Sequence, residues 1–128
     1  MTRIRRCTGS VTTPACDADT FRHVVGHLPS GVTVVTTRTP EADFGMTASS
    51  VTSLSLRPPM MLACLNKESA TSRAVSRAGA YAVNVLGQDH ADLAQRFALP
   101  SDDKFAGLET VASDFGLPLL AAALAHIE

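Results

Sequence analysis

The sequence predicts a mainly β domain, an antiparallel barrel, closed or split, with short helices between its strands. Several short runs are rich in β-branched or apolar residues and are bounded by Gly, Pro or polar turns. Stretches with helical spacing and a capping residue lie between these runs. No internal repeat or low-complexity linker divides the 128 residues, so a single domain is expected.

Composition argues against several classes of partner. Hydrophobic residues make up 45% and charged residues 18%, the balance of a globular chain. A net charge of -1 argues against nucleic acid or an anionic membrane as a partner. No apolar run approaches the ~20 residues of a membrane span. Three cysteines without a Cys-x-x-Cys pair disfavour disulfides or a zinc site, so we expect a cytoplasmic protein.

The N-terminal part is expected to be an arm followed by a helix. Residues 1–16 lack hydrophobic periodicity, which predicts a flexible arm ahead of a domain over 17–128. Asp17 or Asp19 can cap a helix that runs to about Leu28. Its apolar positions fall on one face and are Phe21, Val24, Val25 and Leu28.

The next segments are predicted strands. Residues 31–37 form a β-branched strand, and a polar turn over 39–43 leads into residues 45–56. The latter segment is expected to be one hydroxyl-rich strand, closed by Pro58 and Pro59. One face carries a hydroxyl ladder that is either solvated or ligand-binding, and a bulge would shift its phase. Residues 60–65 are interpreted as a short, buried central strand.

The second half alternates helices and strands. Ser69 can cap a helix over 70–78 that ends at Gly79, and residues 81–86 form a strand. Asp89 can cap a helix over 90–98. Residues 101–118 are loop-like, and 119–127 are taken as strand although their alanines favour helix. The inward-facing positions expected on the two helices are Ala70, Ala74, Val75, Ala78, Leu93 and Phe97.

Motifs for several chemistries are missing from the sequence. It has no Gly-x-Gly-x-x-Gly, no P-loop and no Gly-x-Ser-x-Gly. His23 and His27 are spaced to share a metal, but no third ligand is evident, so a solvated helix face is favoured and no metal site is predicted. Cys64 is expected to be core-packed or pocket-lining and not nucleophilic. Redox chemistry would therefore come from a bound organic cofactor.

Two segments are candidate binding sites. Residues 45–56 offer small hydrogen-bonding groups without charge, which suits a flat, neutral ligand with a polar edge, such as an isoalloxazine ring. Residues 64–72 pass from a strand into a helix N-terminus, where free N–H groups and the hydroxyls of Ser69, Thr71 and Ser72 favour phosphate. An ordinary capping turn is the alternative for the second segment.

Short motifs also follow one another in a recognisable order. They are residues 21–26, 29–37, 45–50, 53–56, 58–59, 66–67, 69–71, 81–86, 96–98, 103–105 and 116–120. Together they resemble the flavin reductase family of the FMN-binding split barrel, the reductase component of two-component flavin monooxygenases. The resemblance implies a split antiparallel Greek-key β-barrel with short flanking helices.

The resemblance also implies a function and a set of cofactor contacts. It implies FMN or FAD as cofactor, NADH or NADPH as hydride donor, a homodimer, and a flavin-dependent monooxygenase that receives the reduced flavin. No catalytic side chain is implied. The implied flavin contacts are Gly45, Met46, Thr47, Ala48, Ser49, Ser50, Cys64, Leu65, Asn66, Ala70, Thr71, Arg96 and Phe97.

One departure from the family pattern leaves an alternative open. Family members continue with further strands, including a Gly-Asp-His-type segment near the nicotinamide, whereas this chain stops at residues 125–128, inside what resembles a barrel strand. We therefore expect a C-terminally truncated relative. The alternative function is a flavin-binding module without reductase turnover.

Overall fold

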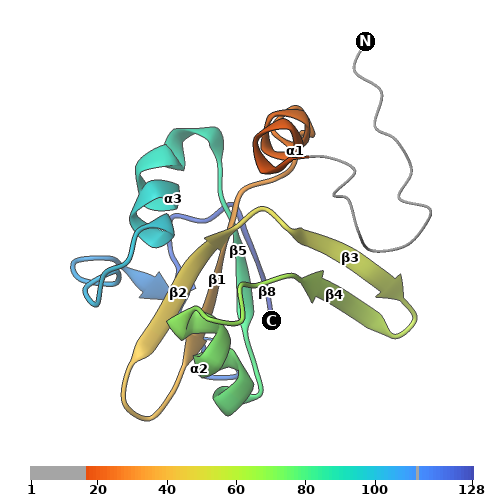
Figure 1. Cartoon of the computed structure of the whole chain (residues 1–128). Helices are drawn as coiled ribbons and strands as arrows, with labels where there is room; N and C mark the ends of the chain where they lie inside the picture. The colour runs from red at the N-terminus through yellow and green to blue at the C-terminus, as the bar shows by residue number, and fades with distance from the viewer. Residues whose placement is uncertain (1–16, 112) are drawn as a thin grey trace.

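A four-stranded antiparallel sheet forms the centre of the computed structural model, which describes residues 17–111 and 113–128 (Figure 1). The strand order is β2-β1-β5-β8. The predicted arm over 1–16 lies outside the described residues. The strands are β1 (Thr33–Arg38), β2 (Asp43–Ala48), β5 (Ala82–Val85) and β8 (Ala125–Ile127). The predicted mainly β, antiparallel class is confirmed.

Strand β1 lies inside the sheet because its β-branched residues can be buried on both faces. It pairs with β2 on one side and with β5 on the other. Val34 packs with Phe97 and Leu120 on one face, while Val35 packs with Val83 on the other. Both valines are fully buried. The sheet therefore separates two small cores.

A buried polar cluster ties the sheet to β7 (Leu119–Leu120) and to the residue before it. The Asn84 amide donates to the Val34 carbonyl at 2.9 Å and to Thr36 Oγ1 at 3.0 Å. Its oxygen accepts the N–H of Leu120 at 2.8 Å, and Thr36 donates to the Pro118 carbonyl at 2.7 Å. Because these buried groups are partnered, they fix the position of the segment without a desolvation penalty.

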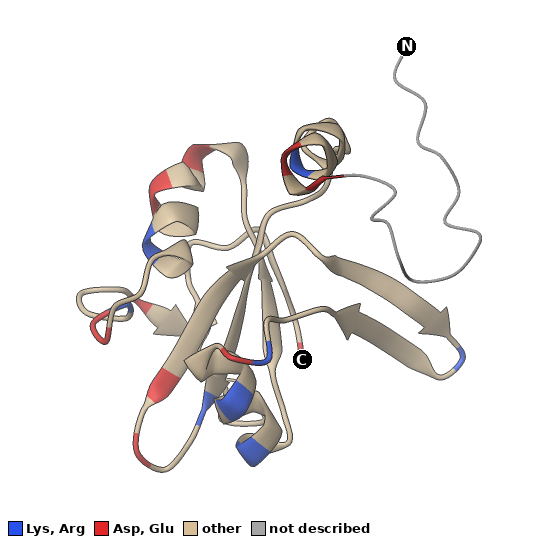
Figure 2. Cartoon of the chain, in the orientation of Figure 1, with Lys and Arg blue, Asp and Glu red and all other residues tan. Residues whose placement is uncertain are grey.

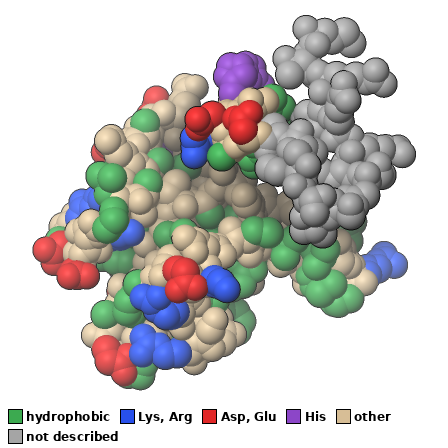
Figure 3. All heavy atoms as spheres, in the orientation of Figure 1, with side chains coloured by type: hydrophobic (Ala, Val, Ile, Leu, Met, Phe, Trp, Pro, Cys, Tyr) green, Lys and Arg blue, Asp and Glu red, His purple; other side chains and the backbone are tan. Residues whose placement is uncertain are grey.

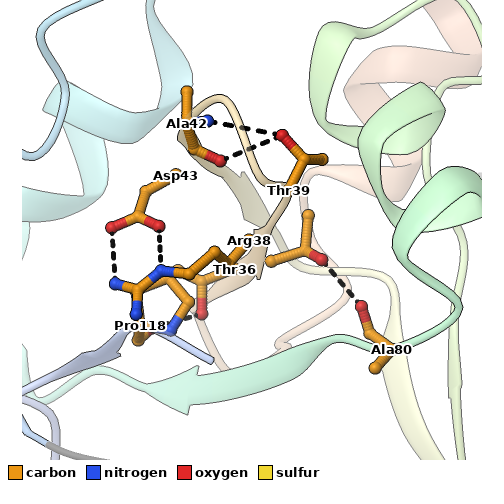
Figure 4. A network of polar contacts seen from close by, with 8 residues as sticks. Thr36, Arg38, Thr39, Ala42, Asp43, Ala80 and Pro118 are labelled. Carbon is orange, nitrogen blue, oxygen red and sulfur yellow. Dashed lines mark hydrogen bonds and ion pairs between the residues drawn. The ribbon is translucent and has the colours of Figure 1, made fainter. Parts of the chain in front are cut away.

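Polar contacts also close the hairpin between β1 and β2 (Figure 4). The Arg38 guanidinium makes a two-pronged ion pair with Asp43, at 2.5 and 2.9 Å, which raises the pKa of Arg38. Thr39 accepts the N–H of Ala42 and closes the turn. These contacts hold β2 where its residues line the cleft described below.

The expected single strand over 45–56 is wrong, because the chain forms two strands in different sheets. β2 ends at Ala48, and β3 (Val51–Leu56) pairs with β4 (Pro59–Ala63) in a two-stranded ribbon that leaves the body of the molecule (Figure 1). The exposed Ser49 and Ser50 make the corner. The hydroxyl ladder does not continue through this corner, and a register shift between Ser53 and Ser55 disturbs the pleat further.

The prediction of a buried central strand over 60–65 is also wrong. β4 pairs only with β3 among the described residues, and Met60 and Leu62 are 44% and 42% exposed. Cys64 is exposed and free, so it does not pack in a core. A short apolar run indicates that a strand can be buried, but it does not show what would cover that strand.

Two of the three helices agree with their predicted caps. Asp17 caps α1 (Ala18–Val25), which ends before Leu28 and buries no residue. Ser69 caps α2 (Ala70–Ala78), which ends at Gly79 with φ of 71°, a conformation that favours glycine. The inward face of α2 is Thr71 and Ala74, and the expected Ala70 and Ala78 are exposed.

The third helix begins differently from the prediction. α3 (Ala91–Ala98) follows a short 3-10 turn, η1 (Gln88–His90), and His90 occupies the N-cap position without a side-chain hydrogen bond. Asp89 is therefore not the cap. Leu93 and Phe97 are buried as predicted.

The strand predicted over residues 119–127 forms as two shorter strands, β7 and β8. β6 (Thr110–Val111) pairs with β7, and β8 pairs with β5, with a turn between β7 and β8. Among the described residues, no helix has both the length and the apolar character that crossing a membrane requires.

Candidate functional site

A cleft of about 710 Å³ opens between β2, the start of α2, the end of α3 and the loop after α3. Its lining residues are Ala42, Asp43, Phe44, Gly45, Met46, Thr47, Asn66, Ser69, Ala70, Thr71, Phe97, Ala98, Pro100, Ser101, Asp102, Lys104 and Phe105. Its volume falls in the ~300–1,000 Å³ range of small-molecule sites. The cleft brings together part of each segment singled out in the sequence, namely residues 45–47 of the first and residues 66 and 69–71 of the second.

The floor of the cleft depends on the glycine of β2. A Cβ at Gly45 would stand 2.5 Å from Phe97 and 3.2 Å from Phe105. The two phenylalanine rings meet edge to face, with centroids 5.1 Å apart. Because residue 45 has no side chain, both rings reach the backbone of β2 and shape one wall of the cleft.

The start of α2 supplies unpaired donors. The Ser69 hydroxyl accepts the N–H of Ser72 at 3.0 Å, which leaves the N–H groups of Ala70 and Thr71 without partners among the described residues. Thr71 lines the cleft and is only 4% exposed, and no other described residue hydrogen-bonds its hydroxyl. These donors, at the positive end of the helix dipole, are suited to an anionic group.

Lys104 places a cation in the cleft. Its ammonium donates to the carbonyl oxygens of Gly45 at 3.2 Å and Phe97 at 3.0 Å. Burial lowers the pKa of Lys104 below its ordinary 10.5. Because the ammonium is tied to β2 and to the end of α3 at once, it holds these two sides of the cleft together.

Two further side chains are committed to contacts inside the protein. Thr47 donates its hydroxyl to the Ala94 carbonyl at 2.5 Å, which fastens β2 to α3. Asn66 accepts the N–H of Glu68 at 3.0 Å and so orders the turn that leads into α2. Both residues line the cleft, but these hydrogen bonds first serve the scaffold.

The structure gathers part of the predicted flavin contacts in the cleft. The predicted contacts that line it are Gly45, Met46, Thr47, Asn66, Ala70, Thr71 and Phe97. They come from β2, from the turn before α2, from the start of α2 and from the end of α3. Residues far apart in the sequence thus line one cleft.

The other predicted contacts lie outside the lining of this cleft. Ser49, Ser50 and Cys64 line a groove of about 830 Å³ beside α1. Ala48 and Leu65 lie near this end of β2, and they belong to or pack against the small core around Val35. Arg96 donates to the carbonyls of Asp103 and Ala106, and so holds the loop that carries Lys104 and Phe105.

Sequence reasoning missed the residues that the loop after α3 contributes. Ser101, Asp102, Lys104 and Phe105 line the cleft although their segment has no periodic pattern. The sequence signal for this loop is the Asp103-Lys104-Phe105 motif, to which the family resemblance assigns no role. Their contribution depends on how the loop folds back onto β2.

The described residues show no grouping of three or more His, Cys, Asp or Glu side chains that could hold a metal. His23 and His27 lie edge to face on α1, with ring centroids 4.9 Å apart. His27 Nδ1 is 2.8 Å from the carbonyl oxygen of His23.

The fold and the cleft can now be compared with known proteins. Residues 25–128 match the flavin reductase like domain, so the chain belongs to this family. The predicted fold class is thereby confirmed. The chain superposes on an NADH:FAD oxidoreductase of Streptomyces globisporus, solved with NAD and FAD fragments, with a TM-score of 0.82 and 37% identity, over 93% of this chain and 72% of the other.

Curated relatives are similar along most of this chain. The reductase component of a 4-nitrophenol 4-monooxygenase/4-nitrocatechol 2-monooxygenase from Rhodococcus opacus is 46% identical over 111 residues, 87% of this chain. An NADH flavin reductase from Kitasatospora aureofaciens is 41% identical over 115 residues, 88% of this chain. The chain spans about 60% of the length of these curated relatives.

Proposed function

We propose that this chain binds FMN or FAD in the cleft and acts as an NAD(P)H-dependent flavin reductase. The observation that carries the proposal is the set of unpaired donors at the start of α2, next to a cleft of flavin-sized volume. The family membership and the named activities of the relatives support it. The domain is assigned to residues 17–128.

The donor chemistry of the cleft fits a flavin phosphate. The N–H groups of Ala70 and Thr71, together with the Thr71 hydroxyl, offer donors to phosphate oxygens. Gly45, Met46 and Phe97 present backbone and apolar surface beside it. Such a neutral wall with a polar end matches the two halves of a flavin nucleotide.

The remaining predicted contacts stay part of the proposal. Ala48, Ser49, Ser50, Cys64 and Leu65 lie past the end of the cleft, toward the groove beside α1, and we assign them to the ring side of the cofactor. We assign Arg96 a positioning role, because its guanidinium holds the loop of Lys104.

The protein's task in this reaction is positioning. A bound flavin would accept a hydride from NADH or NADPH without a catalytic acid or nucleophile from the chain. The residues at the start of α2 would hold the phosphate, and β2 would hold the ring. Hydride transfer then requires the reacting atoms to be about 3–3.5 Å apart.

Partner and location follow from the same proposal. We assign the reduced flavin to a flavin-dependent monooxygenase, because relatives are named as reductase components of such enzymes.

We further assign a homodimer, because the β3–β4 ribbon exposes Leu54, Leu56, Met60 and Leu62. We assign the protein to the cytoplasm, which accords with the free thiol of Cys64.

The first test is NADH oxidation by the 128-residue chain with added FMN or FAD. Turnover well above that of free flavin supports the reductase. Flavin uptake without turnover supports the alternative, a binding module. Failure of the folded chain to bind any flavin contradicts both.

The variant Thr71→Val tests the phosphate pocket. Valine keeps the volume of a buried residue but removes its free hydroxyl, so we expect flavin affinity to fall about threefold to tenfold while the fold is kept. Thr110→Val, on the exposed β6, is the matched control and should leave affinity unchanged. Calorimetric titration measures both. An unchanged flavin affinity in Thr71→Val would contradict the assignment of the flavin phosphate to this pocket.

A further inference from the structure

A second, basic groove lies along α2. Its volume is about 620 Å³, and it is lined by Phe44, Lys67, Ala70, Ser72, Arg73, Ser76 and Arg77. Every charged side chain in this lining is a cation. Figure 2 shows Lys and Arg positions on and just before α2, and Figure 3 shows basic side chains gathered over this part of the surface. We call this surface the α2 shelf.

The α2 shelf continues directly from the proposed flavin cleft. Phe44 and Ala70 line both the cleft and the shelf. Ala70 is the first residue of α2, beside the donors assigned to the flavin phosphate. A group attached to that phosphate could therefore reach the shelf directly from the cleft.

The two arginines of the shelf are spaced along one side of the helix. Arg73 and Arg77 are four residues apart, so their Cβ atoms are about 5–6 Å from each other and the two charges repel. Ser72 and Ser76 follow the same spacing and place hydroxyls beside them. An anion on this surface would relieve the repulsion.

The shelf cations keep most of their hydrogen-bonding capacity. Arg73 donates to the Glu68 carbonyl at 2.6 Å. None of the three cations forms an ion pair within the described part of the chain. The pKa of Glu41 is lowered mainly by its hydrogen bonds to Thr39 and to its own backbone, and slightly by the charge of Arg77. Glu41 and Glu68 therefore lie nearby but outside the lining.

We propose that the α2 shelf binds the second phosphate and the adenosine of FAD, so that this chain takes FAD in preference to FMN. The inference rests on the proposed function, because it places the flavin phosphate at the start of α2. FMN ends at its single phosphate inside the cleft. FAD carries a second phosphate and a nucleoside beyond it, and the shelf presents cations, hydroxyls and the Phe44 ring there.

The test compares FAD and FMN binding to the full 128-residue chain by calorimetric titration. We expect FAD to bind at least about threefold more tightly than FMN in the parent chain. In the double variant Arg73→Gln/Arg77→Gln we expect FAD affinity to fall about threefold to tenfold, the range for two exposed charge contacts, with FMN affinity unchanged. The FAD advantage should shrink at high salt.

The matched control is Arg57→Gln, which removes an exposed cation between β3 and β4, away from α2. It should alter neither affinity. Equal binding of FAD and FMN by the parent chain would overturn the inference and leave the proposed function standing. A double variant that keeps its preference for FAD would also overturn the inference. So would a double variant whose affinity for NADPH falls while its affinity for FAD stays unchanged. If the folded chain binds neither flavin, the proposed function fails, and this inference fails with it.

Discussion

At the scale of single residues, the cleft depends on positions where a side chain is absent or uncommitted. Gly45 lets Phe97 and Phe105 reach the backbone of β2. Thr71 is a buried residue whose hydroxyl has no hydrogen-bond partner among the described residues. Lys104 is instead fixed by two carbonyl oxygens. The cleft thus combines open space, free hydrogen-bond donors and one fixed cation.

Gly45→Ala should damage the protein more than an ordinary glycine substitution. The new methyl group would lie 2.5 Å from Phe97, so the aromatic pair must shift. Overpacking of this kind costs about 1–3 kcal/mol of unfolding free energy. Urea denaturation measures the loss.

Gly31→Ala is the control for Gly45→Ala, because nothing lies within 4 Å of its added Cβ. Its unfolding free energy should stay within about 0.5 kcal/mol of the parent. Equal stabilities of the two variants would show that the rings do not need the space at residue 45.

At the scale of elements, each helix has a different relation to the sheet. α2 and α3 bury residues against the sheet and border the cleft. α1 buries none, and Phe21 is 62% exposed. Local capping therefore matters most for α1, because packing contributes least there.

The start of α1 should depend on pH through Asp17. The backbone N–H of Thr20 and then its hydroxyl bind the carboxylate, which lowers the pKa of Asp17 below its ordinary 3.8. The capping contribution is therefore present above pH 3.8 and is lost as the pH falls through the lower, folded-state pKa. NMR titration of the Asp17 carboxyl and the Thr20 amide measures this.

Asp17→Asn supplies the comparison, because asparagine caps a helix without titrating. Its Thr20 amide signal should not move with pH in the acid range. A carboxyl of Asp17 that titrates at or above its ordinary value would contradict the cap seen in the structure.

At the scale of the whole molecule, the β3–β4 ribbon stands out because it exposes large apolar side chains. A two-stranded ribbon is marginal by itself in water. Leu54 and Leu56 on β3 are 59% and 87% exposed. Figure 3 shows apolar side chains gathered over the ribbon. The proposed homodimer would cover this surface.

Light scattering on the protein as it elutes from a size-exclusion column should therefore give the mass of two chains. Leu54→Lys/Leu56→Lys should shift it toward one chain, because two buried charges would oppose association. Leu99→Lys, on an exposed leucine that follows α3, is the control and should leave the dimer intact. A parent chain that elutes at the mass of one chain, over a range of concentrations, would rule out the ribbon as a stable interface.

The sequence could predict whatever local physics decides. The caps Asp17 and Ser69 and the C-terminal Gly79 were predictable because capping involves only neighbouring residues. The β-branched run of β1 and the buried Leu93 and Phe97 were predictable from periodicity. The ordered motifs predicted the family.

Only the tertiary structure decided which faces are covered and which residues meet. The sequence does not show that β2 and β3 part at Ser49, because a corner between sheets depends on long-range pairing. Nor could it place the loop of Lys104 against Gly45, since nothing local encodes a contact across 59 residues. The candidate site combines a locally encoded helix start with a wall assembled from distant segments.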